Sequence, residues 1–312
     1  MDAPPRTANA TPRVSICLPT WNGEADLKRL LPKLHAQEFA GGFELRAIDS
    51  CSRDRSFELL RAAGARVRTI PQSEFRHGAT RNLLAAEARG EILVFLSQDA
   101  EPVDERFLAA LVAAFDDPRT AGAYARLLPR PEDDPLTART ALDQPEAQSE
   151  PRVAELEPGR ALASLAPRAR AELARFNDVA SAIRASVFRE IPFPDVDFGE
   201  DSAWAACALD AGWRLRFVPE AEAWHAHRYT PREAYRRFRA DARFLGEVHG
   251  FVVRPGLFSV ARGLAYEMRA DVRFLWKRRT ARPWRVLGRS LALRSAQVLG
   301  QYAGSRRARR AR

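Results

Sequence analysis

A carboxylate follows a short apolar run of the chain, residues 92–96 (ILVFL). Five consecutive apolar residues are too few to span a membrane and are typical of a strand buried on both faces. The run is followed by Ser97, Gln98 and Asp99. Because ligands of open parallel α/β sheets bind beyond the carboxyl ends of the strands, Asp99 is placed to meet a metal ion or a phosphate. The alternative is an Asp that only caps the turn before Pro102.

Further polar clusters follow predicted strands or begin predicted helices, and each contains groups that bind ions or move protons. They are Asp49, the segment 76–82 (RHGATRN), Glu200 with Asp201, and His225 with His227. In a parallel sheet, several of these clusters converge on the edge that carries Asp99. A lone Asp, His or Arg is usually a surface or structural group, whereas convergence favours a functional site.

The elements that must position these groups alternate along the chain. Apolar runs predict strands at 14–18, 43–48, 67–70, 92–96 and 122–127, with helices between them. This alternation is typical of a parallel sheet with helices on its faces. The loop after the first strand reads PTWNG rather than G-x-G-x-x-G, which argues against a dinucleotide-binding oxidoreductase.

The pattern fails between residues 129 and 172, which are rich in proline, acids and arginine and are predicted to form a mobile or acceptor-side insertion. Strands and helices then return, and from residue 231 the chain is predicted to be helical. We expect three regions: a disordered N-terminus (1–12), an α/β domain (13–230) and a basic helical C-terminal region (231–312).

Composition is that of a soluble globular protein, with 46% apolar and 29% charged residues among 312. No apolar run approaches the roughly 20 residues of a spanning helix, and the first residues lack the pattern of a secretion signal. Cys17, Cys51 and Cys207 are too scattered for a disulfide framework or a zinc site. These features favour a reducing cytoplasm.

The net charge of +10 is concentrated at the C-terminal end. Residues 251–312 hold sixteen basic side chains against two acids, a net charge of +14, so the other 250 residues sum to −4. A cationic amphipathic helix binds an anionic membrane surface, and nucleic acid is the alternative electrostatic partner. A merely solvated basic tail is the third interpretation.

Six motifs in this order resemble the family 2 inverting glycosyltransferases of the GT-A fold: PTWN (19–22), IDSCSRD (48–54), HGATRN (77–82), FLSQDAEP (95–102), FGEDSAW (198–204) and WHAH (224–227). Within that family, HGATRN, FLSQDA and PFPDVDFGED (192–201) resemble the bacterial rhamnosyltransferase-like branch. The resemblance covers about residues 14–229. It implies a GT-A (Rossmann-like) mixed, mainly parallel sheet flanked by helices, a nucleotide-sugar donor, a divalent cation and a hydroxyl acceptor.

The resemblance assigns the end of the first two strands to the nucleotide. Pro19, Thr20 and Asn22 would line its site, and Trp21 would stack on base or ribose, with core packing as the alternative for Trp21. Asp49 matches the acid that accepts from the ring NH of uracil or thymine.

Four more residues are carried over to donor binding. Arg81 matches the basic residue near the diphosphate, where a guanidinium makes bidentate contacts to phosphate oxygens. Gly78 would let the backbone come close. His77 would contact the donor or make a structural hydrogen bond, and Gln98 completes the donor-binding set.

The resemblance also assigns the metal ligands. Asp99 corresponds to the last carboxylate of the family's D-x-D motif, whose first position is Ser97 here. His225 matches the histidine that completes the metal shell, with His227 as its alternative. The cation would be Mn²⁺ or Mg²⁺, and an imidazole ligand suits Mn²⁺ better.

Asp201 is the expected general base, since an inverting transfer needs a carboxylate to take the proton of the attacking hydroxyl. Its place at a helix N-terminus would keep it ionised. Glu200 is the alternative base, or a helix-capping or acceptor-binding group. Trp204 and Asn177 are assigned to the acceptor side, with core packing as the alternative for Trp204.

The resemblance thus implies a metal-dependent inverting transferase that moves L-rhamnose from dTDP-rhamnose to a saccharide or lipid-linked saccharide hydroxyl during cell-surface polysaccharide synthesis. A UDP-hexose donor is the alternative. A non-catalytic nucleotide-sugar fold that binds membrane or nucleic acid through its basic tail is the alternative of another class. Lipid-linked acceptors favour the membrane over nucleic acid as partner of residues 251–312, with the protein peripheral on the inner face of the plasma membrane.

Overall fold

The computed structural model describes residues 12–280 and 283–310, so the predicted disordered N-terminus lies outside the described residues except for its last residue. The strands are β1 (Val14–Thr20), β2 (Phe43–Asp49), β3 (Arg66–Thr69), β4 (Ile92–Leu96), β5 (Glu101–Pro102), β6 (Thr120–Leu128), β7 (Arg152–Ala154), β8 (Ala180–Arg184) and β9 (Arg214–Trp224). The helices are α1 (Glu24–His35), α2 (Ser56–Ala62), α3 (His77–Glu87), α4 (Phe107–Ala113), α5 (Pro135–Leu142), α6 (Pro167–Leu173), α7 (Ala185–Glu190), α8 (Glu200–Asp210), α9 (Pro231–His249), α10 (Leu257–Lys277) and α11 (Pro283–Arg310).

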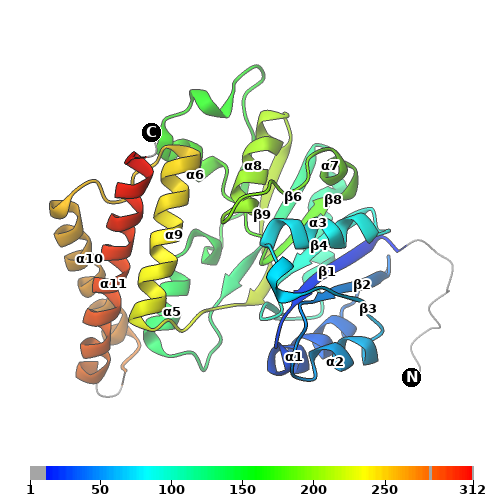
Figure 1. Ribbon diagram of the computed structural model, residues 1–312, viewed down its shortest axis with the longest axis horizontal. Helices are drawn as coiled ribbons and strands as arrows, with labels where there is room; N and C mark the ends of the chain where they lie inside the picture. Colours follow the sequence, from blue (N-terminus) through cyan, green and yellow to red (C-terminus); the bar gives the residue numbers. More distant parts are fainter. Residues whose placement is uncertain (1–11, 281–282, 311–312) are drawn as a thin grey trace.

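The strands form one mixed sheet in the order β3-β2-β1-β4-β8-β6-β9-β5, with β7 paired to β9 (Figure 1). The four strands from β3 to β4 run parallel, which places their carboxyl ends at one edge. Strand β8 is antiparallel to both β4 and β6. The amino end of β8 therefore meets the carboxyl end of β4, the edge at which we expected ligands.

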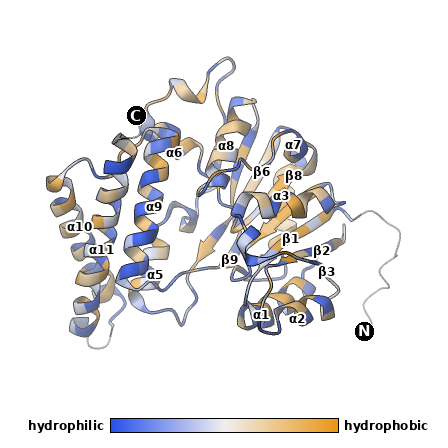
Figure 2. Ribbon diagram, in the orientation of Figure 1, coloured by the Kyte–Doolittle hydropathy of each residue, from blue (hydrophilic) through white to orange (hydrophobic). Residues whose placement is uncertain are grey.

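Strand β4 is buried on both faces because helices cover each side of the sheet. Ile92, Val94 and Leu96 pack with α1, α2 and α4, whereas Leu93 and Phe95 pack with α3, α7 and α8. The apolar colouring of β1, β4 and β8 in Figure 2 follows from this double coverage. The predicted α/β sheet flanked by helices is confirmed.

Residues 129–172 contain helices and a strand rather than a continuous loop. Helix α5 begins after Asp134, whose carboxylate accepts from Leu136 N at 3.1 Å, and β7 extends the sheet beside β9. Strand β9 continues to Trp224 and pairs with both β5 and β6.

Helices α9, α10 and α11 confirm the predicted helical C-terminal region and lie beside the sheet domain (Figure 1). Helices α9 and α11 approach closely, since a Cβ on Gly304 would lie 2.2 Å from Arg239 O. A buried ionic cluster fixes α10 between α5 and α11: Asp271 accepts from Arg294 at 2.9 Å and from the Ser290 hydroxyl, and Arg139 Nε lies 2.5 Å from it. Within the described residues, no helix combines the length and apolar character that a membrane span needs.

Candidate active site

Asp99 stands just beyond the carboxyl end of β4. Ser97 N donates to Val179 O at 2.8 Å, and Ala100 N donates to Ser97 O at 3.0 Å, so the backbone turns at this point. Arg130, which follows β6, donates from Nη2 to the Asp99 carbonyl at 3.3 Å. These backbone contacts hold the Asp99 carboxylate in one position.

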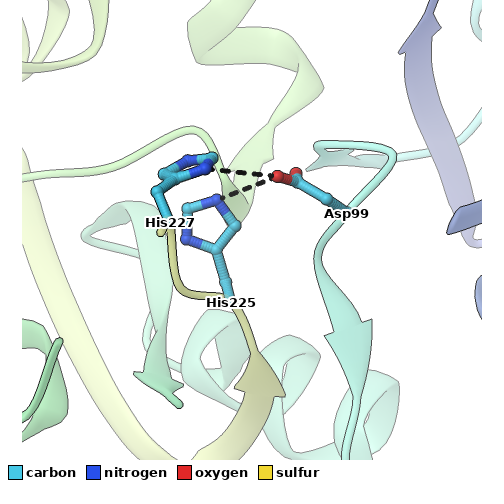
Figure 3. Close-up of side chains that lie close together, drawn as sticks. All are labelled: Asp99, His225 and His227. Carbon is cyan, nitrogen blue, oxygen red and sulfur yellow. Dashed lines mark ion pairs between the residues drawn. The ribbon is translucent and has the colours of Figure 1, made fainter. Parts of the chain in front are cut away.

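His225 and His227 follow β9 and face Asp99 (Figure 3). His225 N donates to Leu128 O at 2.8 Å, which continues the pairing of β9 with β6 beyond the strand. His225 Nε2 lies 3.5 Å from Asp99 Oδ2, and His227 Nδ1 lies 3.9 Å from the same oxygen. The structure thus brings together all three predicted metal ligands.

Burial and charge set the protonation of this cluster. Burial tends to raise the pKa of Asp99, but the hydrogen bond and charge of His225 outweigh it and lower that pKa to about 2. Burial, together with the charge of His225, lowers the pKa of His227 to about 4. At neutral pH, Asp99 is therefore ionised and His227 is neutral, which are the forms that bind metal ions.

The cluster fits a divalent cation. One atom from each of Asp99, His225 and His227 lies within 4.8 Å of the other two. A carboxylate oxygen with two imidazole nitrogens is a donor set that suits Mn²⁺ better than an all-oxygen Mg²⁺ site. Ser97 replaces the first carboxylate of the D-x-D motif. The imidazoles of His225 and His227 would supply two further ligands beside Asp99.

Two buried polar atoms lie without a hydrogen-bond partner at the ends of β1 and β2. Thr20 pairs with Asp49 in the β1–β2 register. One Asp49 oxygen accepts from Ser52 N at 3.0 Å, whereas Asp49 Oδ1 and Thr20 Oγ1 have no partner within the described part of the chain. Because an unpaired buried polar atom is costly, this pair fits the polar edge of a ligand.

The loop after β1 is held by side chains of the predicted set. Trp21 N donates to Gln98 Oε1 at 2.9 Å, and Gln98 Nε2 donates to Trp21 O at 3.3 Å. Asn22 Oδ1 accepts from Arg53 N at 2.8 Å. Gln98 and Asn22 therefore shape the loop, and the Trp21 side chain stays exposed. Pro19 is a buried member of β1.

Arg81 is buried and paired inside the protein. Its Nε lies 3.1 Å from Asp178 Oδ2, and its Nη1 lies 3.6 Å from Glu200 Oε1 and donates to His77 O at 3.2 Å. The predicted phosphate contact of Arg81 stays a prediction, with two carboxylates as its partners here. A Cβ on Gly78 would lie 3.1 Å from Pro194 O, so this glycine lets α3 pack against the loop that precedes α8.

Glu200 and Asp201 form the first turn of α8. Gly199 precedes them with φ 79°, and Phe244 of α9 lies where a Cβ would be, at 2.5 Å. Burial and the charge of Asp178 raise the pKa of Asp201 to about 7, and burial with the charges of Asp178 and Asp201 raises the pKa of Glu200. The expected effect of the helix N-terminus is therefore outweighed by burial and a neighbouring carboxylate.

Trp204 does not form an acceptor wall. Its side chain is 0% exposed, packs on Phe176 and Phe193, and donates from Nε1 to Ile191 O at 2.8 Å. The acceptor-side prediction for this residue is wrong because helical spacing alone does not distinguish a core tryptophan from one lining a site. Asn177 lies in the segment just before β8, where its Oδ1 accepts from Ala180 N at 3.2 Å.

Arg237 of α9 was missed by the sequence interpretation. Its guanidinium lies over the Phe198 ring at 4.9 Å, its Nε pairs with Asp241 at 3.2 Å, and its side chain is 49% exposed. Burial and the charge of His225 are larger causes of the lowered pKa of His227, and the positive charge of Arg237 lowers it further. The same charge opposes the rise in the pKa of Asp201 that burial and Asp178 produce. Arg237 thus lies close to both His227 and the first turn of α8. The helical pattern around it in the sequence indicates only an amphipathic helix.

Comparisons with known proteins agree with this architecture. A profile of the family Glycosyl transferase family 2 matches residues 15–164. The chain is 27% identical to O-antigen chain rhamnosyltransferase RfbN of Salmonella typhimurium, covering 72% of this chain and 70% of the relative. It is also 27% identical to O-antigen chain rhamnosyltransferase WbaN of Salmonella anatum, covering 94% and 89%.

Solved structures agree on the fold. A mannosyltransferase, PcManGT from Pyrobaculum calidifontis in complex with GDP-Man and Mn²⁺, has a TM-score of 0.58 at 19% identity over 93% of this chain and 87% of its own. S. aureus TarS 1–349 in complex with UDP-GlcNAc has a TM-score of 0.53 at 18% identity, covering 95% and 91%. Residues 15–164 therefore match a glycosyl transferase family 2 domain, and the chain shares the GT-A fold of these structures.

Proposed function

We propose that this glycosyltransferase is inverting and metal-dependent and moves L-rhamnose from dTDP-rhamnose to a hydroxyl of a saccharide or lipid-linked saccharide in cell-surface polysaccharide synthesis. The names of the relatives RfbN and WbaN support the sugar. The single observation that carries the donor is the buried, unpaired Asp49 Oδ1 beside Thr20 Oγ1. A carboxylate accepts the ring NH of thymine or uracil, which distinguishes these two bases from cytosine and adenine, whose ring nitrogens at that edge carry no hydrogen.

The donor diphosphate would lie between β4 and α9. A divalent cation held by Asp99, His225 and His227 would neutralise charge on the diphosphate as it leaves. Arg237 supplies a further cation there, because its terminal nitrogens are not among the hydrogen bonds and ion pairs of the described residues. A guanidinium with free N–H groups is suited to phosphate oxygens.

Asp201 takes the proton of the attacking acceptor hydroxyl. The acceptor oxygen forms a bond to the anomeric carbon on the side opposite the diphosphate, the bond from that carbon to the phosphate oxygen breaks, and dTDP leaves. Asp201 is preferred to Glu200 as the base because Glu200 faces Arg81 at 3.6 Å. A carboxylate whose pKa is raised to about 7 is well matched to accept a proton near neutral pH.

Thermal unfolding with dTDP, UDP and GDP, each with and without Mn²⁺, tests the donor. Ligands that bind only the folded state raise the melting temperature, so we expect the largest rise with dTDP and Mn²⁺. Asp49→Ala should reduce the rise with dTDP and with UDP, because it removes the acceptor of their ring NH. A larger rise with GDP than with dTDP would overturn the donor assignment, and transfer from UDP-hexose alone would replace it.

Association with the cytoplasmic face of the plasma membrane belongs to the same proposal, because a lipid-linked acceptor is presented there.

A further inference from the structure

Helix α10 presents a regular exposed stripe. Every third or fourth residue faces solvent, in the order Phe258, Arg262, Ala265, Arg269, Val272 and Trp276. Phe258 is 82% exposed and Trp276 is 84% exposed. Spacing of three and four residues places these side chains on one face of the helix. Large aromatic residues with this much exposure on one face mark an interaction surface.

The opposite face of α10 holds its acids. Glu267 and Asp271 are the only acidic residues of α10, and both are buried. Asp271 pairs with Arg294 and Arg139, and Glu267 accepts from Gln297 at 3.1 Å. Both acids of α10 are paired in the buried cluster, which also fixes the rotation of the helix. The charged residues of the exposed stripe are therefore all basic.

Helix α11 also exposes aromatic and basic side chains near its start. Trp284 in its first turn is 69% exposed, and Arg285 and Leu291 are exposed, whereas Arg289 pairs with Asp134 before α5 at 3.4 Å. Residues 272–312 contain no Asp or Glu. Figure 1 shows α10 at the edge of the molecule farthest from β3, with α11 between α10 and α9. We call the exposed α10 stripe together with Trp284, Arg285 and Leu291 the hairpin face.

We propose that the hairpin face docks this protein on an anionic lipid bilayer. Tryptophan and phenylalanine enter the headgroup boundary, and the arginines pair with anionic headgroups while their aliphatic stems cover apolar surface. A second copy of the chain would bring two acid-free basic faces together, which repel each other. A nucleic acid backbone would satisfy the arginines but would leave Phe258, Val272 and Leu291 without an apolar partner.

This inference deepens the proposed function by naming the partner that would hold the enzyme beside a lipid-linked acceptor. It does not depend on which sugar is transferred. The buried ionic cluster matters here, because a rigidly oriented helix can present its stripe without paying an ordering cost on binding.

Sedimentation of the full-length protein with vesicles tests the proposal. One set of vesicles is phosphatidylcholine, and the other is phosphatidylcholine with phosphatidylglycerol. The protein should bind the anionic vesicles, and Phe258→Ser with Trp276→Ser should weaken that binding by about tenfold or more. Arg262→Gln with Arg269→Gln should abolish the preference for phosphatidylglycerol. The matched control is Phe57→Ser with Val153→Ser, two exposed apolar residues outside the hairpin face.

Two further measurements keep the outcomes distinct. The thermal shift with dTDP and Mn²⁺ should be unchanged in the hairpin-face variants, which shows that they are folded and separates this test from the donor test. Light scattering in solution measures the molar mass and so detects a dimer of this chain. Equal vesicle binding by the wild type and the Phe258/Trp276 variant, no vesicle binding by the wild type, or a dimer that these substitutions dissociate, would overturn the proposal.

Discussion

The Ser202 hydroxyl and His249 Nε2 lie 3.0 Å apart and join the first turn of α8 to the last turn of α9. Ser202 Oγ also donates to Ala174 O at 3.0 Å, so the histidine is the donor in the bond between them. Burial and then the charge of Arg170 lower the pKa of His249 to about 4, which keeps its ring neutral. Helix α9 therefore supports the turn that contains Asp201.

His249→Ala should lower kcat by roughly tenfold while the affinity for dTDP changes little, because a loosened α8 misplaces the base rather than the donor. His249→Gln, whose amide can donate to Ser202, should recover part of the loss. The neighbouring Val248→Ala is the control, since its side chain is exposed. Steady-state kinetics and dTDP calorimetry separate the two effects, and an equal loss of both would contradict the positioning role.

The pH dependence of transfer should report Asp201. A base must be ionised to accept a proton, so kcat/KM should fall as the pH drops below about 7 and level off above it. Asp178→Asn removes a negative charge that raises the pKa of Asp201, so the acidic limb should move to lower pH. A limb that does not move would remove Asp178 from this interaction.

Asp201→Asn should leave donor binding nearly intact and lower turnover by about 10²- to 10⁴-fold, the usual range for a general base. Asp195→Asn, in the exposed acidic loop before α8, is the control. Unchanged transfer by the Asp201 variant would assign the base to another group, and Glu200→Gln then becomes the decisive variant.

Asp99→Ala should remove the Mn²⁺ dependence of dTDP binding, because it deletes the oxygen that both histidines face. Calorimetry of dTDP with and without Mn²⁺ measures this. Asp104→Ala, a more exposed carboxylate beyond β5, should behave like the wild type. Identical Mn²⁺ dependence in the Asp99 variant would exclude the metal-ligand cluster.

Arg237→Gln should weaken dTDP binding by about tenfold or more, as expected for a hydrogen bond between a cation and a phosphate. Arg236→Gln is a close control, because it removes the same charge one residue away on another side of α9. If both variants weaken binding equally, the effect is a general loss of positive potential, and Arg237 makes no specific contact.

The parts of this protein that could be predicted from its sequence are those defined by local patterns. The run at 92–96 indicated a doubly buried strand, and residues after strands indicated Asp99, His225 and His227 as partners. Both follow from sheet geometry, which repeats in every parallel α/β fold. Asp99 does lie in the turn before Pro102, and its carboxylate also faces the two histidines.

The parts that could not be predicted depend on contacts between distant segments. Helix α5 has little apolar periodicity because Arg139, one of its buried residues, pairs with acids of α10. The raised pKa of Asp201 depends on its burial and on the charge of Asp178, which belongs to the chain before β8. Trp204 has the same spacing whether it packs in the core or lines a site, so only the fold decides.

In the proposed donor site, the pairing of Thr20 with Asp49 would make base recognition depend on the alignment of β1 with β2. Adjacent side chains on a strand point to opposite faces, so a shift of β2 by a single residue would turn Asp49 away from Thr20 and bring Ile48 or Ser50 opposite it. A core substitution that weakens the alignment of β2 would then abolish nucleotide binding without touching the nucleotide. A substitution far from the site can therefore remove donor binding by changing the register of β1 with β2.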